Sequence, residues 1–380
     1  MMKMFLIVQY ALKMISIINN KLIVFKYNFT FNYNMNKIES GEKLDFNNVL
    51  IRPKRSTINS RSEISLNREF SFKNCKTIKW NGVPVISANM DTTGTFEVYE
   101  CLKKHNIVTA LHKFYTTEQL YQYSKKNTLD PNYFMISTGI SDNDYVNLVD
   151  TLSKVYCNWI CIDIANGYID TFVKFCKRVR TMFPNKIIVA GNVVTREMVE
   201  QLILEGGVDI VKVGIGPGSA CTTRLKTGVG MPQLSAILEC ADAAHGVDGH
   251  IISDGGITCP GDMAKAFGAG ADFVMVGGQF AGHDQNPGEI IEENGKKMKL
   301  FYGMSSDHAQ NIHYGKMEKY RSSEGRIIKI PYKGDLNNTI LDFLGGIRSA
   351  CTYINARTIK QMPKCTTFVK VSQQLNTHFV

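Results

Sequence analysis

The sequence predicts an α/β fold in which eight parallel strands close into a (β/α)8, or TIM, barrel. Three observations support this prediction. Eight short apolar runs recur along the chain, amphipathic stretches separate them, and the run centres lie 22 to 27 residues apart except for one interval of 41. Short strands that are apolar on both faces belong to a buried parallel sheet. Eight such units favour a closed barrel over an open, doubly wound sheet.

The predicted strands and helices follow one another in order. The strands are expected at residues 83–88, 107–111, 134–137, 159–164, 187–190, 209–213, 250–253 and 272–276. A helix over 195–204 is predicted from Thr195 at its N-cap and a glycine pair after its end. A helix over 260–267 begins at a proline, and a last helix covers 336–351. A small flap or hairpin is expected as an insertion after the eighth strand.

Composition limits the classes of function. The net charge of +10 can attract anions, including phosphorylated small molecules, nucleic acid or a membrane surface. No basic run is interleaved with aromatic residues, so we expect neither a nucleic-acid nor a membrane partner. The ten cysteines lack the spacing of a zinc site or of a disulfide scaffold. Reduced thiols and a cytoplasmic protein are therefore expected, with Cys157 and Cys161 inside one buried strand.

Residues 1–40 differ from the barrel domain, which we expect to cover 41–375 without an inserted regulatory CBS pair. Residues 1–34 contain four lysines and no acidic residue. The apolar stretch 5–18 is interrupted by Lys13 and is too short to span a bilayer. No small-residue cleavage site follows, and the first arginine is Arg52, unlike a mitochondrial presequence. We expect a disordered or artefactual extension, with Met35 as a plausible start and targeting or membrane contact as the alternative.

Glycine pairs follow the last two predicted strands, at Gly255-Gly256 and Gly277-Gly278. Barrels commonly bind phosphate at this place, because glycine lets backbone N–H groups approach the oxygens. Ser219 in the preceding glycine-rich loop offers a hydroxyl. Tight βα turns are the alternative explanation for each pair. The presence of both pairs favours a phosphate site.

Cys221 is the candidate nucleophile. It lies in the long loop after the sixth predicted strand, among Gly, Ser and Thr residues and shortly before Arg224. A thiol near positive charge can ionise and attack an electrophilic carbon, whereas a buried cysteine is only a small hydrophobe. We assign the buried role to the other nine cysteines. Thr223 could pass protons if a base drives it, and Glu324 could be that base or a solvated surface residue.

The segment VGIGPGSACTTRLKTGVGMPQLSAI, residues 213–237, resembles the catalytic cysteine loop of the GMP reductases. These enzymes belong to the larger family that includes IMP dehydrogenase. The resemblance covers about residues 41–375 and extends through 43–63, 88–96, 239–246, 250–278, 301–306, 320–325 and 344–356. It implies that Cys221 attacks C2 of the GMP purine, while Thr223 and Glu324 help to protonate the departing amine. NADPH would then supply a hydride, and IMP and ammonia would be the products.

The resemblance also implies the binding residues. GMP would meet Ser219, Asp254, Gly255, Gly256, Gly277, Gly278, Gly303, Met304, Ser305, Arg321, Ser322, Ser323 and Gly325. NADPH would meet Ser60, Arg61, Lys113, Asp163, Ile164, Ala165, Ile215, Gly216, Met304, Tyr320, Arg321, Ser349, Ala350, Cys351 and Thr352. A monovalent cation, K+, would meet Gly216, Gly218, Cys221 and Arg224. The family forms homotetramers, so Ser60, Arg61 and residues 349–352 would belong to a neighbouring subunit's cofactor site.

Three alternatives remain. IMP dehydrogenase usually has regulatory modules inserted early in its barrel, but only about twenty residues separate the second and third predicted strands here. It also uses an Arg-Tyr pair on a flap, where this chain has Lys319-Tyr320-Arg321. A silent nucleotide binder would have lost the nucleophile or its partners, and Cys221, Thr223 and Glu324 are all present. A flavin-dependent barrel oxidoreductase is conceivable from the fold alone.

Overall fold

The computed structural model describes residues 38–316 and 322–372. Residues 43–380 form one compact unit, and residues 1–42 are assigned to another. Most of the extension predicted at 1–40 therefore lies outside the described residues, as do two predicted site residues, Tyr320 and Arg321.

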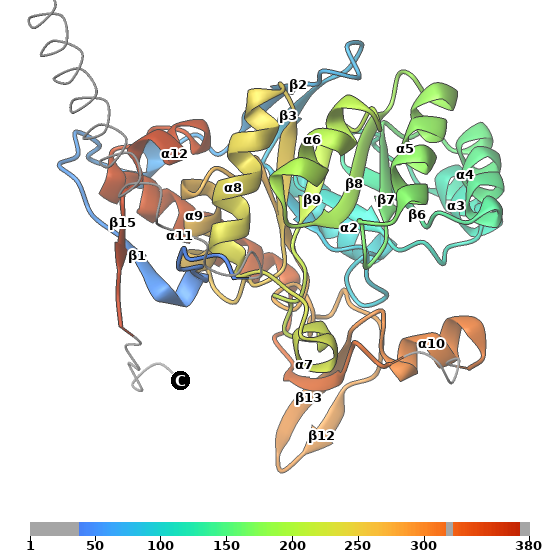
Figure 1. Ribbon diagram of the computed structural model, residues 1–380. Helices are drawn as coiled ribbons and strands as arrows, with labels where there is room; N and C mark the ends of the chain where they lie inside the picture. Colours follow the sequence, from blue (N-terminus) through green and yellow to red (C-terminus); the bar gives the residue numbers. More distant parts are fainter. Residues whose placement is uncertain (1–37, 317–321, 373–380) are drawn as a thin grey trace, which may run out of the picture. The chain divides into compact units, whose positions relative to one another are not determined.

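Eight parallel strands close into a barrel, which confirms the predicted fold class (Figure 1). The strands are β4 (Val85–Ser87), β5 (Val108–Leu111), β6 (Phe134–Thr138), β7 (Trp159–Asp163), β8 (Ile187–Val193), β9 (Ile210–Val213), β10 (His250–Asp254) and β11 (Phe273–Val276). Each strand pairs in parallel with the next, and β11 pairs with β4 to complete the ring. All eight predicted runs thus supply a barrel strand.

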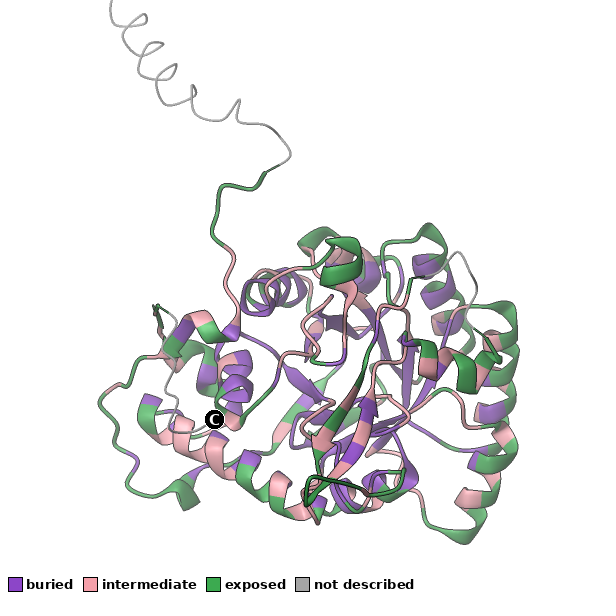
Figure 2. Ribbon diagram, turned by 90° about the horizontal axis from the view of Figure 1, so that it is seen from below, coloured by how far each residue is buried: buried purple, intermediate pink, exposed green. Residues whose placement is uncertain are grey.

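Helices follow the strands and cover the barrel. They are α2 (Phe96–Leu102), α3 (Thr117–Lys126), α4 (Asp142–Lys154), α5 (Asp170–Met182), α6 (Arg196–Leu204), α8 (Gln233–Gly246), α9 (Pro260–Gly268) and α11 (Leu336–Ile354). Buried residues lie on the strands and on the inner faces of the helices, and exposed residues lie on the outer helix faces (Figure 2). The apolar runs became strands because both of their faces are covered in this arrangement.

The predicted helices are confirmed, with small shifts at their ends. Thr195 is the N-cap residue of α6, but its side chain makes no capping hydrogen bond. Helix α11 continues three residues beyond the predicted end, to Ile354, and ends where Asn355 adopts a left-handed φ of 61°.

Two strand predictions need correction. Strand β8 runs to Val193 rather than Ala190, because its pairing with β9 resumes after an irregularity at Gly191. Gly191 and Asn192, which follow the predicted end, therefore lie within the strand. Cys157 precedes β7 instead of lying inside it, although it is fully buried.

The floor of the barrel, where the strands begin, is closed by the hairpin of β2 (Arg68–Ser71) and β3 (Lys79–Gly82). Two carboxylates, each 1% exposed, lie here at the starts of β9 and β11. Asp209 accepts the backbone N–H of Ile188 on β8 at 2.9 Å, and Asp272 accepts that of Ile251 on β10 at 3.0 Å. Each carboxylate also binds an arginine, Arg180 or Arg68, so neither charge is buried without a partner.

The predicted flap after the eighth barrel strand is larger than a hairpin. It contains a three-stranded antiparallel sheet of β12 (Ile291–Glu293), β13 (Lys296–Tyr302) and β14 (Ile327–Pro331), with α10 (Asp307–Tyr314) between β13 and β14. Figure 1 shows this flap next to the short helix α7 (Thr223–Thr227), which lies in the loop after β9.

The remaining elements are short. They are β1 (Val49–Ile51), β15 (Phe368–Lys370), α12 (Met362–Cys365) and the 3-10 turns η1 (Phe46–Asn48), η2 (Arg61–Glu63), η3 (Lys103–His105) and η4 (Ile359–Gln361). In the part of the chain that the structure describes, no helix is both long enough and apolar enough to cross a membrane.

Candidate active site

A cavity of about 710 Å³ opens where the barrel strands end. Such a volume suits a small-molecule ligand. Its wall includes most of the predicted substrate residues, the three predicted catalytic residues and part of the predicted cofactor set. These are Asp163, Ile164, Ala165, Ile215, Gly216, Gly218, Ser219, Cys221, Thr223, Asp254, Gly255, Gly256, Gly277, Gly278, Gly303, Met304, Ser305 and Glu324.

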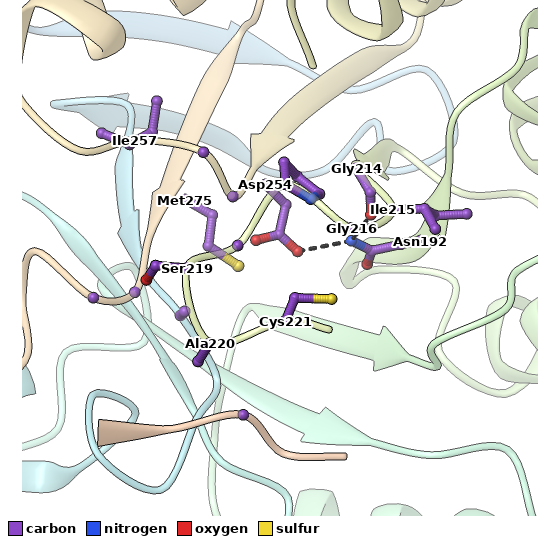
Figure 3. A pocket seen from close by; sticks show the side chains of 18 of the residues that line it. Asn192, Gly214, Ile215, Gly216, Ser219, Ala220, Cys221, Asp254, Ile257 and Met275 are labelled. Atoms are coloured by element: carbon purple, nitrogen blue, oxygen red, sulfur yellow. Dashed lines mark hydrogen bonds between the residues drawn. The ribbon is translucent and has the colours of Figure 1, made fainter. Parts of the chain in front are cut away.

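A hydrogen-bonded chain joins the three predicted catalytic side chains. The Cys221 thiol donates to Thr223 Oγ1 at 3.2 Å, and the Thr223 hydroxyl donates to Glu324 Oε2 at 2.7 Å. Cys221 is half-buried and faces the same space as Ser219 and Asp254 (Figure 3). A carboxylate that accepts from a hydroxyl can draw a proton from the thiol through it. The sequence alone could not place Glu324, which is 101 residues from Thr223.

Backbone contacts hold Glu324 in this position. Thr222 N–H donates to the Glu324 carbonyl at 2.8 Å, and the Thr222 hydroxyl donates to the Ser323 carbonyl at 3.1 Å. Gly325 forms an isolated antiparallel bridge with Cys221. The chain that returns from α10 is therefore fastened to the cysteine loop on both sides of Glu324.

Both glycine pairs lie in the cavity wall. Gly255 and Gly256 have φ values of 90° and 80°, a region that other residues rarely adopt. A Cβ atom on Gly278 would lie 3.1 Å from Ser219 Oγ, so this turn leaves little room for a side chain. Backbone N–H groups in such bare turns can approach a phosphate closely.

Lys212 was not predicted as a site residue, and it joins the two halves of the cavity. Its ammonium group lies 2.5 Å from Asp163 Oδ1 and 2.8 Å from Asp254 Oδ2, with only 4% of its side chain exposed. Burial acts to lower the pKa of Lys212, but the two carboxylates outweigh it and raise the pKa. Burial likewise acts to raise the pKa of Asp163, and the Lys212 charge outweighs it and lowers the pKa. Lys212 and Asp163 are therefore both charged at neutral pH.

Asn192 also orients Asp254 and was not predicted. Its amide donates to Asp254 Oδ2 at 2.8 Å, the contact drawn in Figure 3, and to the Gly214 carbonyl at 2.7 Å. One sequence signal could have revealed Lys212: a lysine in the middle of the apolar run of β9 needs a buried partner. Asn192 gave no comparable signal, because it followed the predicted end of its strand.

Several residues assigned to NADPH by resemblance do not line this cavity. Lys113 lines a separate cavity of about 180 Å³ between α3 and α4. Ser60 and Arg61 lie at η2, which packs against the helix that carries residues 349–352. Within that helix, the side chain of Cys351 is fully buried in the core, so Cys351 could meet a ligand only through its backbone.

Two of the four carbonyls suggested for a monovalent cation accept a backbone hydrogen bond. The Gly218 carbonyl accepts the Cys221 N–H at 3.0 Å, and the Arg224 carbonyl accepts the Gly228 N–H at 3.1 Å. The Arg224 side chain binds Asp45 and the Met231 carbonyl instead of the cavity. Among the described residues, no cluster of three or more His, Cys, Asp or Glu side chains could hold a metal ion. A carbonyl oxygen that accepts one hydrogen bond keeps a second lone pair. Neither observation therefore excludes a cation held by backbone carbonyls of the cysteine loop.

The prediction that the other nine cysteines are buried holds for seven of them. It is wrong for Cys259, which is exposed and lines the cavity, and for Cys365, which is half-buried. Cys259 precedes α9 in the loop after β10, and a loop at the end of a barrel strand is open to the ligand side.

Comparisons with known proteins agree with this geometry. Residues 43–377 match the model of the IMP dehydrogenase / GMP reductase domain. A GMP reductase of Caenorhabditis elegans is 56% identical over 348 residues, which span 91% of this chain and 97% of the relative. GMP reductase 1 of Homo sapiens is 54% identical across 91% of this chain and 100% of its own length. A GMP reductase of Buchnera aphidicola is 57% identical across 90% and 98%. The resemblance drawn from the sequence is confirmed, and the chain belongs to the IMP dehydrogenase/GMP reductase family.

Proposed function

We propose that this chain is a GMP reductase, which converts GMP to IMP and ammonia at the expense of NADPH. The observation that carries the proposal is the hydrogen-bonded chain from Cys221 through Thr223 to Glu324, beside glycine turns suited to phosphate. Relatives with that name match almost the whole of their own length. A nucleophile, its proton acceptor and a nucleotide cradle are what this reaction needs.

The barrel would bind the nucleotide from its phosphate to its base. The turns at Gly255-Gly256 and Gly277-Gly278, with the Ser219 hydroxyl, would hold the phosphate. Asp254, oriented by hydrogen bonds from Lys212 and Asn192, would accept both ribose hydroxyls. The base would lie near Cys221, enclosed by Gly303, Met304, Ser305 and the segment 321–325.

The first chemical step is displacement of the amine. Cys221 Sγ forms a bond to C2 of the purine, while the thiol proton passes through the Thr223 hydroxyl to Glu324. The carbon–nitrogen bond to the exocyclic amine then breaks, and the same chain returns a proton so that the amine leaves as ammonia. The purine remains bound to Cys221 through C2. Splitting a difficult displacement into two steps lowers the barrier of each.

The second step is release of IMP. NADPH, when bound, supplies a hydride to C2, and the bond between C2 and Cys221 Sγ breaks with its electron pair on sulfur. Cavity-lining Asp163, Ile164, Ala165, Ile215, Gly216 and Met304 would hold the cofactor beside the nucleotide. Asp163 suits this position because Lys212 keeps it ionised and able to accept from hydroxyl groups.

Further parts of the cofactor site would come from outside this cavity. Lys113, Tyr320 and Arg321 would contact NADPH from the barrel and the flap. Ser60, Arg61 and residues 349–352 would serve the site of a neighbouring subunit in a homotetramer. Their joint position at η2 and α11 is compatible with such a shared surface. The same resemblance supports K+ on the carbonyls of the cysteine loop and a cytoplasmic location.

An absorbance assay at 340 nm tests the proposal and its alternatives. Purified protein is given GMP with NADPH in one reaction and IMP with NAD in another. GMP-dependent loss of absorbance, with IMP and ammonia as products, is the expected result. A gain of absorbance with IMP and NAD would instead make the chain an IMP dehydrogenase. Activity in neither reaction would favour a silent nucleotide binder, and a yellow purified protein would indicate a flavin enzyme.

A further inference from the structure

Helix α10 of the flap contacts the segment that carries Glu324. At its N-terminus, Ser306 caps the helix by accepting the Ala309 N–H at 3.3 Å. The Asp307 N–H donates to Ser323 Oγ at 3.2 Å, one residue before Glu324. Eight residues of helix form a rod about 12 Å long. A displacement of the C-terminal end of α10 would therefore be transmitted to Glu324, the residue that accepts the proton.

The far end of α10 is fixed to the barrel at Asp91, in the loop after β4. His313 Nε2 lies 2.6 Å from Asp91 Oδ2, and the Tyr302 hydroxyl donates to the same oxygen at 3.2 Å. The Asp91 N–H lies 3.5 Å from the sulfur of Met304, which lines the cavity. Three residues of the flap thus converge on one residue of the barrel.

A second contact supports the first. The His313 ring stacks on Phe114, with ring centroids 3.4 Å apart and planes 5° from parallel. The side chains of His313 and Asp91 are 15% and 11% exposed, so their contact is largely shielded from water. A shielded hydrogen bond between a carboxylate and an imidazole is stronger than an exposed one.

We propose that Asp91 and His313 are positioning residues for this reaction: their contact holds α10 on the barrel, so that Met304 and Glu324 stay in place over the cavity. The inference rests on the proposed function and deepens it. Neither residue touches the nucleotide site, and both act through groups that do.

Other titratable groups lie around the contact. The Lys113 ammonium lies 5.5 Å from the centre of the Phe114 ring, on which His313 stacks. His112 is the other nearby imidazole, and burial lowers its pKa to about 4. It is therefore neutral near pH 7 and brings no second positive charge to Asp91. His308 lies against the Tyr302 ring, with ring centroids 4.6 Å apart and planes 75° from parallel.

Four variants test the proposal by steady-state kinetics with GMP and NADPH. Asp91→Asn and His313→Ala should each lower kcat about tenfold, the size of one charge-assisted hydrogen bond. KM for GMP should change less than about threefold, because the phosphate and ribose contacts belong to the barrel. The double variant Asp91→Asn/His313→Ala should be no slower than His313→Ala, since both changes break one contact. His313→Gln, which keeps an N–H donor, should recover most of the lost rate.

Hydrogen–deuterium exchange gives a readout that does not depend on activity. Amides of α10 should exchange faster in Asp91→Asn and His313→Ala than in the wild type. The control is Asn311→Ala on the exposed face of the same helix, which should leave both kcat and exchange unchanged. The proposal is overturned if the single variants keep kcat within about twofold, if their effects multiply, or if His313→Gln is as slow as His313→Ala. If the wild type leaves GMP and NADPH unchanged, the proposed function fails. The hydrogen–deuterium exchange of the α10 amides still shows in that case whether Asp91 anchors the helix.

Discussion

Replacement of Lys212 by methionine removes an ammonium group that lies between two carboxylates. Methionine has a similar length and an apolar stem, so the change deletes the charge and little else. Asp163 and Asp254 are then left near each other, 32% and 20% exposed, without their shared partner. The variant therefore tests whether Lys212 holds the ribose side and the cofactor side of the cavity together.

The expected loss of stability follows from the distances. Opposite charges about 3 Å apart attract by about 5 kcal/mol at an effective dielectric constant of about 20. Desolvation of the buried charges offsets much of this, and removing one partner of a buried pair destabilises by about 3–5 kcal/mol. Partial exposure of both carboxylates places Lys212→Met near the lower figure. For a domain of this size, that corresponds to a fall in Tm of about 4 °C.

The pH dependence should change sign. In the wild type, the lowered pKa of Asp163 contributes stability above its unfolded pKa of about 3.9, and this stability is lost as the pH falls. In Lys212→Met, two neighbouring carboxylates repel, so one of them takes up a proton and its pKa rises. A raised carboxyl pKa makes the folded state lose stability as the pH rises. The deficit relative to wild type should therefore grow from about pH 5 to about pH 8.

Thermal unfolding across that pH range measures the effect, and calorimetric titration with GMP measures binding. The control is the double variant Lys212→Met/Asp163→Asn, which removes one carboxylate as well and should recover much of the lost stability at the higher pH. Equal Tm and equal pH dependence in Lys212→Met and wild type would refute the reasoning.

Three further predictions concern the nucleophile, its base and the barrel floor. Cys221→Ala should abolish turnover while GMP still binds, as judged by the 340 nm assay and calorimetry, and retained activity would rule out the covalent mechanism. Glu324→Gln should slow single-turnover deamination more than it weakens GMP binding, and an unchanged deamination rate would remove Glu324 from the proton chain. Burial acts to raise the pKa of Asp272, but hydrogen bonds from His245 and His250 and the charge of Arg68 outweigh it and hold the pKa far below its usual range. Its stabilisation is therefore present above about pH 4 and lost on acidification, and Asp272→Asn should destabilise by about 3–5 kcal/mol at neutral pH, measured by denaturant unfolding.

The barrel could be predicted from the sequence because its signal is local. Each strand is an apolar run and each helix has its own period and end signals, as at Pro260 and Gly268. The end of β8 was missed because the apolar run stops at Ala190, and only pairing with β9 reveals that the strand continues. Strand pairing depends on the tertiary structure, and the sequence of one apolar run does not determine it.

The site residues also divide into those that a local sequence signal reveals and those that depend on the tertiary structure. The glycine pairs and Cys221 were visible because the ends of barrel strands are where function lies. Glu324 was found only by resemblance, since 101 residues separate it from Thr223 and its position depends on how the flap folds back. Lys212, a partner of Asp254, was missed because the apolar run around it suggested only a strand.

The two carboxylates at the barrel floor have a consequence for the cavity at the other end. A slip of one residue in β9 or β11 would turn Asp209 or Asp272 to the opposite face of its strand and separate it from its arginine. Such a slip would also change the stagger between neighbouring strands, which sets the tilt and width of a closed barrel. By pinning β8 to β9 and β10 to β11, the floor fixes the height at which Asp254 and the glycine turns emerge. Substitutions far from any ligand can therefore alter the alignment of the nucleotide without touching its site.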